Sequence, residues 1–145
     1  MGLKPLKAQD SATAPDPALV FHGRASMGPL VVERWIRPGE TIPDAFIEAK
    51  VYEHATVLMQ GRPLLKLTAS DGNRYRIDEH SGTDINGDGI PDLIVHEFSG
   101  GAHCCSSTVI YAVRGSAIPY FRVYTEHCGG KLEDLDHDRR MEFTT

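Results

Sequence analysis

The chain has 145 residues, a formal net charge of −5 at pH 7 and a hydrophobic fraction of 41%. This length fits one domain that can bury a core. No Lys/Arg cluster or basic stripe with aromatic residues is present, which argues against nucleic-acid binding. No apolar run is long enough for a membrane-spanning helix. The P-loop, G-x-S-x-G, H-E-x-x-H and G-x-G-x-x-G motifs are all missing, so we expect no enzymatic activity.

Residues 1–17 differ in composition from the rest of the chain. They hold three prolines with scattered Lys and Asp residues, and they lack the apolar core of a signal peptide. We expect a flexible N-terminal arm rather than an intact secretory signal, because prolines and small polar residues disfavour a helix. A signal could lie upstream, could have been removed, or could be missing from a protein that is not secreted.

Residues 18–145 are expected to form a single β domain. Short apolar runs alternate with Gly-, Asp- and Asn-rich turns, a pattern typical of an antiparallel all-β fold. The short strands could form a propeller-blade-like sheet or a compact β-sandwich. Alternation over 45–59 favours one or two strands, with a helix over 43–53 as the alternative. Residues 64–68 and 74–77 flank a Ser-Asp-Gly-Asn turn and predict a hairpin. Further strands are expected at 18–22, 29–36, 93–98, 107–113 and 119–125.

The most informative stretch is a loop at residues 84–92, just before the expected strand at 93–98. Asp84, Asn86 and Asp88 are two residues apart, so a tight loop can aim their oxygens at one point. Gly89 permits the sharp turn that follows, Ile90 can offer its carbonyl, and Asp92 adds a carboxylate. Hard cations prefer oxygen ligands, and Ca²⁺ takes 6–8 of them. We therefore predict a calcium site.

Two tight turns at Asn-Gly and Asp-Gly would explain only part of this spacing. Between Ile77 and Val113 the chain carries six acidic residues and no Lys or Arg. Such a concentration of carboxylates is repulsive without a cation. The local charge therefore favours metal binding over turns alone.

The loop departs from an EF-hand, whose twelfth position is a bidentate Glu, because Val95 stands there inside a strand. An acid at the ninth position followed directly by a strand resembles the calcium loops of FG-GAP and VCBS-type repeats. Those repeats occur in integrin-like β-propellers and in secreted bacterial proteins. The resemblance implies a Ca²⁺-ordered structural or adhesion module outside the cytoplasm, in the periplasm, at the cell surface or beyond.

A second copy of this pattern lies 50 residues further on, at 133–145. It offers Asp134, Asp136, Asp138 and Glu142 as ligands. However, it places Arg139 at the position of Gly89 and a histidine at that of Gly87. It could be a weak second calcium site or a metal-free remnant.

The second repeat is cut short where its strand should begin, and such a fragment cannot close a propeller of 4–8 blades. Three alternatives follow. The chain could be a piece of a longer protein, a compact domain that borrows only the loop, or a subunit whose open sheet edge is completed by another copy.

The chain has three cysteines, Cys104, Cys105 and Cys128, all in the second half of the domain. The Gly-Gly-Ala-His-Cys-Cys stretch before the strand at 107–113 is similar to one in secreted bacterial proteins with this loop type. A strand register that pairs Ala112 with Tyr120 also pairs Cys104 with Cys128, so we expect that disulfide, with Cys105–Cys128 as the alternative. A disulfide would fit an oxidising compartment, where millimolar calcium is available.

Two more specific functions, a transition-metal site and a hydrolase, are alternatives to a structural calcium module. His103, Cys104 or Cys105, His127 and Cys128 have side chains that suit a transition metal, but their spacing matches no standard zinc motif. Glu97 and Glu126 could form the carboxylate pair of a hydrolase if they faced each other across a cleft. The other histidines are expected on the surface or in the core.

We therefore expect a calcium-binding module that binds a protein partner or itself, with carbohydrate as a further possible ligand. The alternative is a self-assembling surface or filament subunit that uses open β edges and strand donation.

Overall fold

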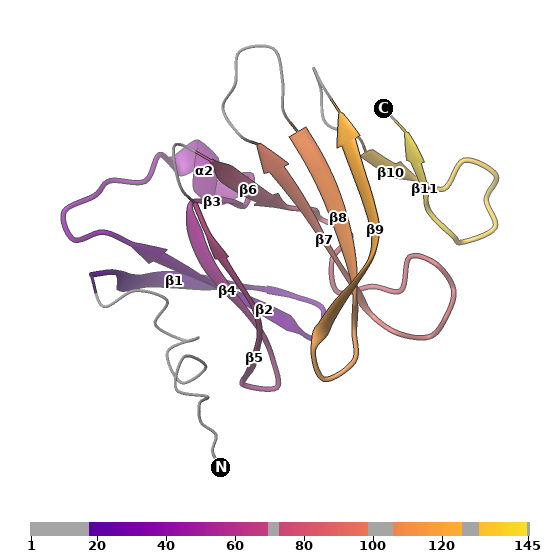
Figure 1. The fold of residues 1–145 in the computed structure, drawn as a ribbon, viewed down its shortest axis with the longest axis horizontal. Helices are drawn as coiled ribbons and strands as arrows, with labels where there is room; N and C mark the ends of the chain where they lie inside the picture. The colour runs from indigo at the N-terminus through magenta and orange to yellow at the C-terminus, as the bar shows by residue number, and fades with distance from the viewer. Residues whose placement is uncertain (1–17, 70–72, 99–105, 126–130, 145) are drawn as a thin grey trace.

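The computed structural model of the protein describes residues 18–69, 73–98, 106–125 and 131–144 (Figure 1). Its strands form three antiparallel sheets, which confirms the expected all-β fold. One sheet contains β1 (Val20–Met27), β2 (Leu30–Ile36), β4 (His54–Met59) and β5 (Arg62–Thr68), in that order. The second contains β3 (Val51–Tyr52), β6 (Arg74–Ile77), β7 (Asp92–Phe98), β8 (Ser106–Val113) and β9 (Ala117–Thr125). The third is a hairpin of β10 (Lys131–Glu133) and β11 (Glu142–Thr144).

The two large sheets pack face to face around the main core, so the compact sandwich describes this chain better than a propeller blade. Residues of the four-stranded sheet, such as Leu30, Val32 and Val57, join Ile77 and Leu93 of the five-stranded sheet in one buried cluster. All five are at most 1% exposed. Their period-2 spacing along each strand places them on one face, as the alternating sequence pattern predicts.

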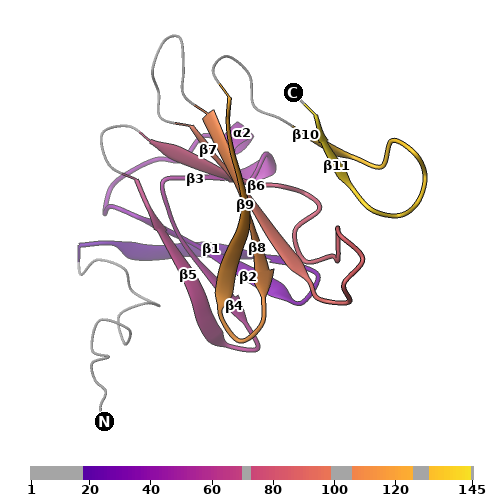
Figure 2. The same ribbon diagram turned by 45° about the vertical axis from the view of Figure 1, so that its right-hand side comes forward.

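The five-stranded sheet also buries part of its opposite face. Ile94 and Ile110 alternate with the main-core residues and join a smaller cluster with Ile85 and Leu132. Met141 and Phe143 of the β10–β11 hairpin pack against this cluster. Figures 1 and 2 show the hairpin lying beside the five-stranded sheet, with its long loop directed away from the sandwich.

Residues 45–59 contain both a helix and strands. The helix α2 spans Asp44–Glu48 and ends where Lys50 adopts a φ of 58°. A residue in this left-handed conformation commonly terminates a helix. β3 and β4 follow directly, so the strand prediction for 45–59 was right for this part and wrong for 45–48, where the alternative of a helix within 43–53 is confirmed. None of the described helices is long and apolar enough to cross a membrane.

The predicted hairpin of residues 64–68 and 74–77 was wrong. β5 pairs with β4, whereas β6 pairs with β3 and β7 in the other sheet. The connection after β5 therefore crosses between the two layers, and residues 70–72 lie outside the described part. A Ser-Asp-Gly-Asn turn permits either geometry, and the buried side chains of Leu67 and Ile77 decide between them by facing the shared core.

The predicted register between the next two strands also needs correction. Ala112 pairs with Ile118 rather than with Tyr120, and Ser106 pairs with Thr125. An irregularity between Ile110 and Tyr111 changes the pairing part-way along the ladder. The register argument for Cys104–Cys128 therefore no longer holds, and all three cysteines lie outside the described residues.

Candidate metal centre

The first acidic loop is closed at its neck by backbone hydrogen bonds. The N–H of Asp92 donates to Thr83 O and the N–H of Gly82 donates to Asp92 O, each at 2.8 Å. Gly82 has a φ of +91° and approaches Gly28 so closely that a Cβ at Gly82 would overlap the carbonyl oxygen of Met27. Only glycine fits here, and this contact ties the loop to the β1–β2 turn of the sandwich.

The Asp84 carboxylate organises the inside of the loop. Its Oδ1 accepts the N–H groups of Asn86, Gly87 and Asp88 at 3.3, 2.8 and 3.2 Å, and its Oδ2 accepts that of Gly89 at 2.6 Å. Burial raises the pKa of Asp84, but these backbone donors outweigh it and lower the pKa below its usual value. The carboxylate is therefore held ionised by the loop itself.

Two smaller side-chain turns complete the backbone path. Asn86 Oδ1 accepts the N–H of Asp88 at 3.2 Å, and Asp88 Oδ1 accepts that of Ile90 at 2.9 Å. Gly87 and Gly89 both have a φ of +82°. The alternation of acceptor side chains and left-handed glycines is what wraps the loop around one centre.

Asp92 forms the buried wall of this centre and is 0% exposed. Its Oδ2 accepts the N–H of Ile85 at 2.8 Å and its Oδ1 accepts the hydroxyl of Tyr120 at 2.9 Å. Burial raises the pKa of Asp92, and repulsion from Asp88 and Asp84 adds to this. Burial and the hydrogen bond to Asp92 raise the pKa of Tyr120. A cation among the three carboxylates would remove this repulsion.

Three of the five predicted ligands therefore come together as a carboxylate group. Ligand oxygens of Asp84, Asp88 and Asp92 lie within 4.8 Å of one another. Asn86 and Ile90 belong to the same loop. Tyr120 was missed by sequence reasoning because it comes from β9 and reaches Asp92 across 28 residues. Oxygen donors of this kind suit a hard divalent cation such as Ca²⁺.

The second acidic loop repeats the geometry of the first at an offset of 50 residues. Five hydrogen bonds recur between equivalent atoms. In the second copy they join the N–H groups of Leu135, Asp138, Arg139 and Arg140 to the side chains of Asp134, Asp136, Asp138 and Glu142. Ligand oxygens of Asp134, Asp136 and Asp138 again lie within 4.8 Å of one another.

Two residues in the second loop adopt the conformation that glycine has in the first. His137 has a φ of 62° and Arg139 a φ of 71°, at the positions of Gly87 and Gly89. Partial desolvation and a hydrogen bond shared with Asp138 raise the pKa of Asp136, whereas the N–H of Arg140 lowers that of Asp138. Because His137 and Arg139 take left-handed conformations that favour glycine, the second loop keeps the path of the first at the cost of backbone strain.

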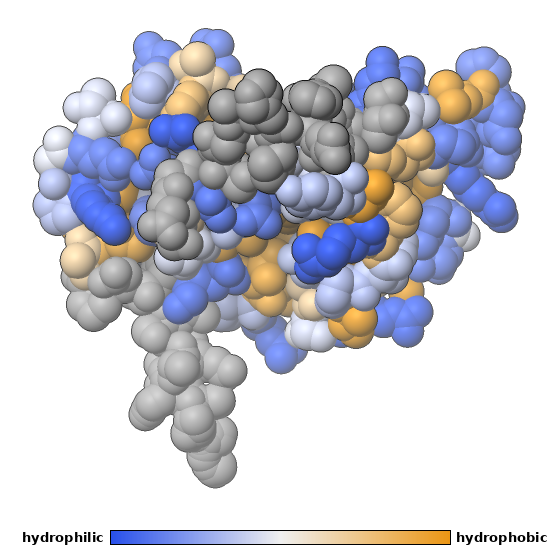
Figure 3. Space-filling model, turned by 45° about the horizontal axis from the view of Figure 1, so that its top comes forward, coloured by the Kyte–Doolittle hydropathy of each residue, from blue (hydrophilic) through white to orange (hydrophobic). Residues whose placement is uncertain are grey.

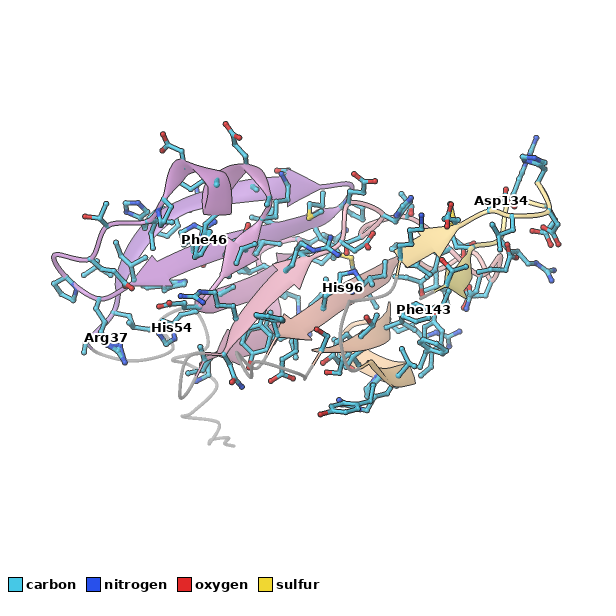
Figure 4. The ribbon with its side chains drawn as sticks, turned by 90° about the horizontal axis from the view of Figure 1, so that it is seen from above. Arg37, Phe46, His54, His96, Asp134 and Phe143 are labelled. Carbon is cyan, nitrogen blue, oxygen red and sulfur yellow. The ribbon has the colours of Figure 1, made fainter. Side chains whose placement is uncertain are left out.

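The two loops touch each other. The N–H of Met141 donates to Ile85 O at 2.8 Å. A Cβ on Gly87 would lie 3.1 Å from Arg140 Nε, so the Arg140 side chain lies against the first loop. Figure 4 shows Asp134 at the far end of the molecule and Phe143 nearer the sheet, where its ring lies 5.6 Å from that of Phe121. The end that carries the second loop is largely hydrophilic in Figure 3.

A buried polar network lies elsewhere on the five-stranded sheet. The Asp78 carboxylate receives His96 Nε2 at 2.7 Å, His80 Nδ1 at 2.8 Å and the N–H of His80 at 2.9 Å. His96 Nδ1 lies 2.8 Å from the hydroxyl of Thr108. Both ring nitrogens of His96 are therefore used, and Thr108 is 1% exposed. The network joins Asp78, which follows β6, to β7 and β8. His96 and His54 are both buried, so these two belong to the core rather than to the surface.

Most residues of the predicted transition-metal site and of the predicted carboxylate pair lie outside the described residues. His103, His127 and Glu126 lie there with the cysteines. Glu97 lies on β7, where it accepts a hydrogen bond from Asn73 Nδ2 at 3.0 Å.

The fold and site define a two-layer antiparallel β-sandwich with a docked hairpin and two matching acidic loops. The chain matches no protein-family model, no curated protein and no solved structure. The resemblance to FG-GAP and VCBS-type repeats therefore stays a prediction from the sequence motifs.

Proposed function

We propose that the protein is an extracytoplasmic calcium-binding structural module. The observation that carries this proposal is the repetition of one loop geometry at two places, with three carboxylates gathered at each. A carboxylate has about four acceptor sites. In the first loop Asp88 accepts one hydrogen bond and Asp92 two, so both keep lone pairs for an ion, whereas Asp84 accepts four. Ca²⁺ accepts this kind of irregular, oxygen-only ligand set.

In this proposal the ion acts on stability rather than on chemistry. Ca²⁺ offsets the repulsion among Asp84, Asp88 and Asp92, and Asp92 is also the first residue of β7. Ordering the loop therefore fixes the entry of a central strand. The binding free energy adds to the free energy of unfolding of the domain.

The location and the biological role come from the family resemblance. Many bacterial proteins with such loops are secreted, and a calcium-ordered sandwich outside the cytoplasm fits adhesion or surface display. The partner would be a protein, another copy of the chain or a carbohydrate. This step is an analogy of fold and loop and is separate from the metal chemistry.

The test is thermal unfolding in calcium and in excess chelator, with Asp88→Ala beside the native chain. Calcium at a hundred times its dissociation constant should stabilise the native chain by about 2.7 kcal/mol. Asp88→Ala should lose most of this response. Glu48→Ala, which removes an exposed carboxylate from α2, is the matched control and should keep it. A native chain whose melting temperature is equal in calcium and chelator would refute the proposal.

Self-assembly is the second candidate, and the edge strand β9 favours it. Ile118, Tyr120 and Tyr124 on this strand are 48%, 44% and 62% exposed. Unpaired strand edges with apolar side chains are templates for strand addition. Pro119 removes one N–H from this strand, which limits how far such pairing could extend. Sedimentation velocity of the native chain and Ile118→Lys tests this: assemblies that the lysine abolishes support it, and a monomer at all concentrations contradicts it.

A further inference from the structure

A second feature of the sandwich, far along the chain from the acidic loops, is a buried arginine. Arg34 on β2 is only 6% exposed. It follows Leu30 and Val32 at two-residue spacing, so its side chain lies on the inner face of the four-stranded sheet. Charged side chains are almost never buried to this extent unless they are paired.

The contacts of Arg34 do not include an acid. Its Nη1 donates to Val51 O at 2.7 Å, and its guanidinium carbon lies 4.2 Å from the centre of the Tyr52 ring. By contrast, the guanidinium groups of Arg24 and Arg74 lie 3.6 and 3.7 Å from Glu33 and Glu53. Among the described residues, no carboxylate compensates the charge of Arg34. Burial lowers its pKa, and the Tyr52 phenol is the group that opposes this shift.

A cavity of about 130 Å³ lies beside Arg34. His22, Arg24 and Arg34 line it, and Ile47 of α2 and Tyr52 of β3 form apolar walls. The guanidinium of Arg24 is paired with Glu33, so among the described residues the cation of this lining without a carboxylate partner is Arg34. The pairing of β1 with β2 is irregular between Phe21 and Arg24. Gly23 lies in this irregularity with a φ of +109°, and a Cβ there would meet open space. The missing side chain leaves the cavity accessible at the edge of the sheet.

We propose that this cavity binds a small oxyanion, a carboxylate or a phosphate-like dianion, through the Arg34 guanidinium. An arginine fork donates two parallel hydrogen bonds to such groups, and one of its nitrogens is already oriented by Val51. The cavity holds the volume of about four water molecules at ~30 Å³ each, which suits an ion of four or five heavy atoms. The Tyr52 ring and the Val51 carbonyl hold the cation in place before the anion arrives. This inference is independent of calcium binding.

The test uses sodium acetate and sodium sulfate as probes against sodium chloride at constant ionic strength, with calcium present throughout. Binding is followed by the amide chemical shift of Gly23 and by the melting temperature. We expect a saturable shift with at least one probe, and about tenfold or greater weakening in Arg34→Met. Saturation by acetate alone would identify a carboxylate ligand, and saturation by sulfate alone a phosphate-like one.

The decisive variant is Ile47→Glu, because Ile47 lines the cavity from an exposed position on α2 and is 46% exposed. A tethered carboxylate there should raise the melting temperature without added anion and abolish the response to both probes. Ile47→Gln is the matched neutral control and should bind as the native chain does. The proposal is overturned if no probe gives a saturable shift in the native chain, or if Ile47→Glu responds as strongly as Ile47→Gln.

Discussion

Asp78→Asn is expected to lower the free energy of unfolding by about 2–4 kcal/mol at pH 7. The carboxylate of Asp78 is 4% exposed and receives three hydrogen bonds, from His96 Nε2, His80 Nδ1 and the N–H of His80. A hydrogen bond to a charged group contributes about 1.5–3 kcal/mol, and leaving a buried donor without its acceptor costs about 1–3 kcal/mol. The side chain of His80 is 30% exposed, so its share is reduced by solvent screening.

The pH dependence of this loss distinguishes a charge effect from a packing effect. Burial raises the pKa of Asp78, but the hydrogen bonds from His96 and His80 outweigh it and hold the pKa far below its usual range. A group with a lowered pKa stabilises the native state above its unfolded pKa of about 3.9 and loses this contribution as the pH falls. The difference between the native chain and Asp78→Asn should therefore shrink below about pH 4.

Urea denaturation at pH 7, 5 and 3 measures this difference directly. Glu79→Gln is the control, because it neutralises the exposed neighbouring carboxylate and should change stability by no more than about 0.5 kcal/mol. An Asp78→Asn variant as stable as the native chain at pH 7 would contradict the reasoning. A loss of the same size at pH 3 and pH 7 would also contradict it, because packing rather than charge would then explain the effect.

Two glycine-related substitutions test the backbone arguments by urea denaturation in calcium. Arg139→Gly should stabilise the chain by about 0.5–1 kcal/mol, because glycine adopts the positive φ of this position without strain. Arg139→Ala keeps the strain and is the control. A loss of stability in Arg139→Gly would show that the contacts of the arginine side chain outweigh the backbone strain. Gly82→Ala should destabilise by about 2–4 kcal/mol, because strain and the overlap with Met27 add together. Gly115→Ala has the strain without the overlap and should cost about 1 kcal/mol, so equal losses would refute the proposed contact.

The inside of each acidic loop could be predicted because its contacts are local. The bonds from Asp84 join it to residues two to five positions later, so the spacing of acceptors and glycines determines the path. In the second loop the same spacing of acceptor side chains gives the same path, although glycine is missing from both left-handed positions. Arg139 at the position of Gly89 suggested that the second loop could differ, but five of the hydrogen bonds of the first loop recur there, including the one from the N–H of residue 139. Side-chain acceptors therefore impose the loop even against the conformational preference of arginine.

Contacts that depend on the relation between strands could not be predicted in the same way. Tyr120 reaches Asp92 only because β9 pairs with β8, which pairs with β7. His96 meets Asp78 only because β6 and β7 are neighbours, which places residue 78 beside the centre of the sheet. The crossing after β5 and the irregularity at Ile110 are decided by which side chains reach the shared core. Turn residues and apolar alternation in the sequence do not predict the crossing after β5 or the irregularity at Ile110.

Ile85 explains why the smaller core is built on the outer face of the five-stranded sheet. Its N–H donates to Asp92, its carbonyl accepts the N–H of Met141, and its side chain packs beside Ile94 and Leu132. One residue of the first loop thus carries a bond to the buried carboxylate, a bond to the docked hairpin and part of the hydrophobic cluster. A hairpin of two three-residue strands is only marginally stable by itself. Its position depends on Ile85, and hence on the order of the first acidic loop.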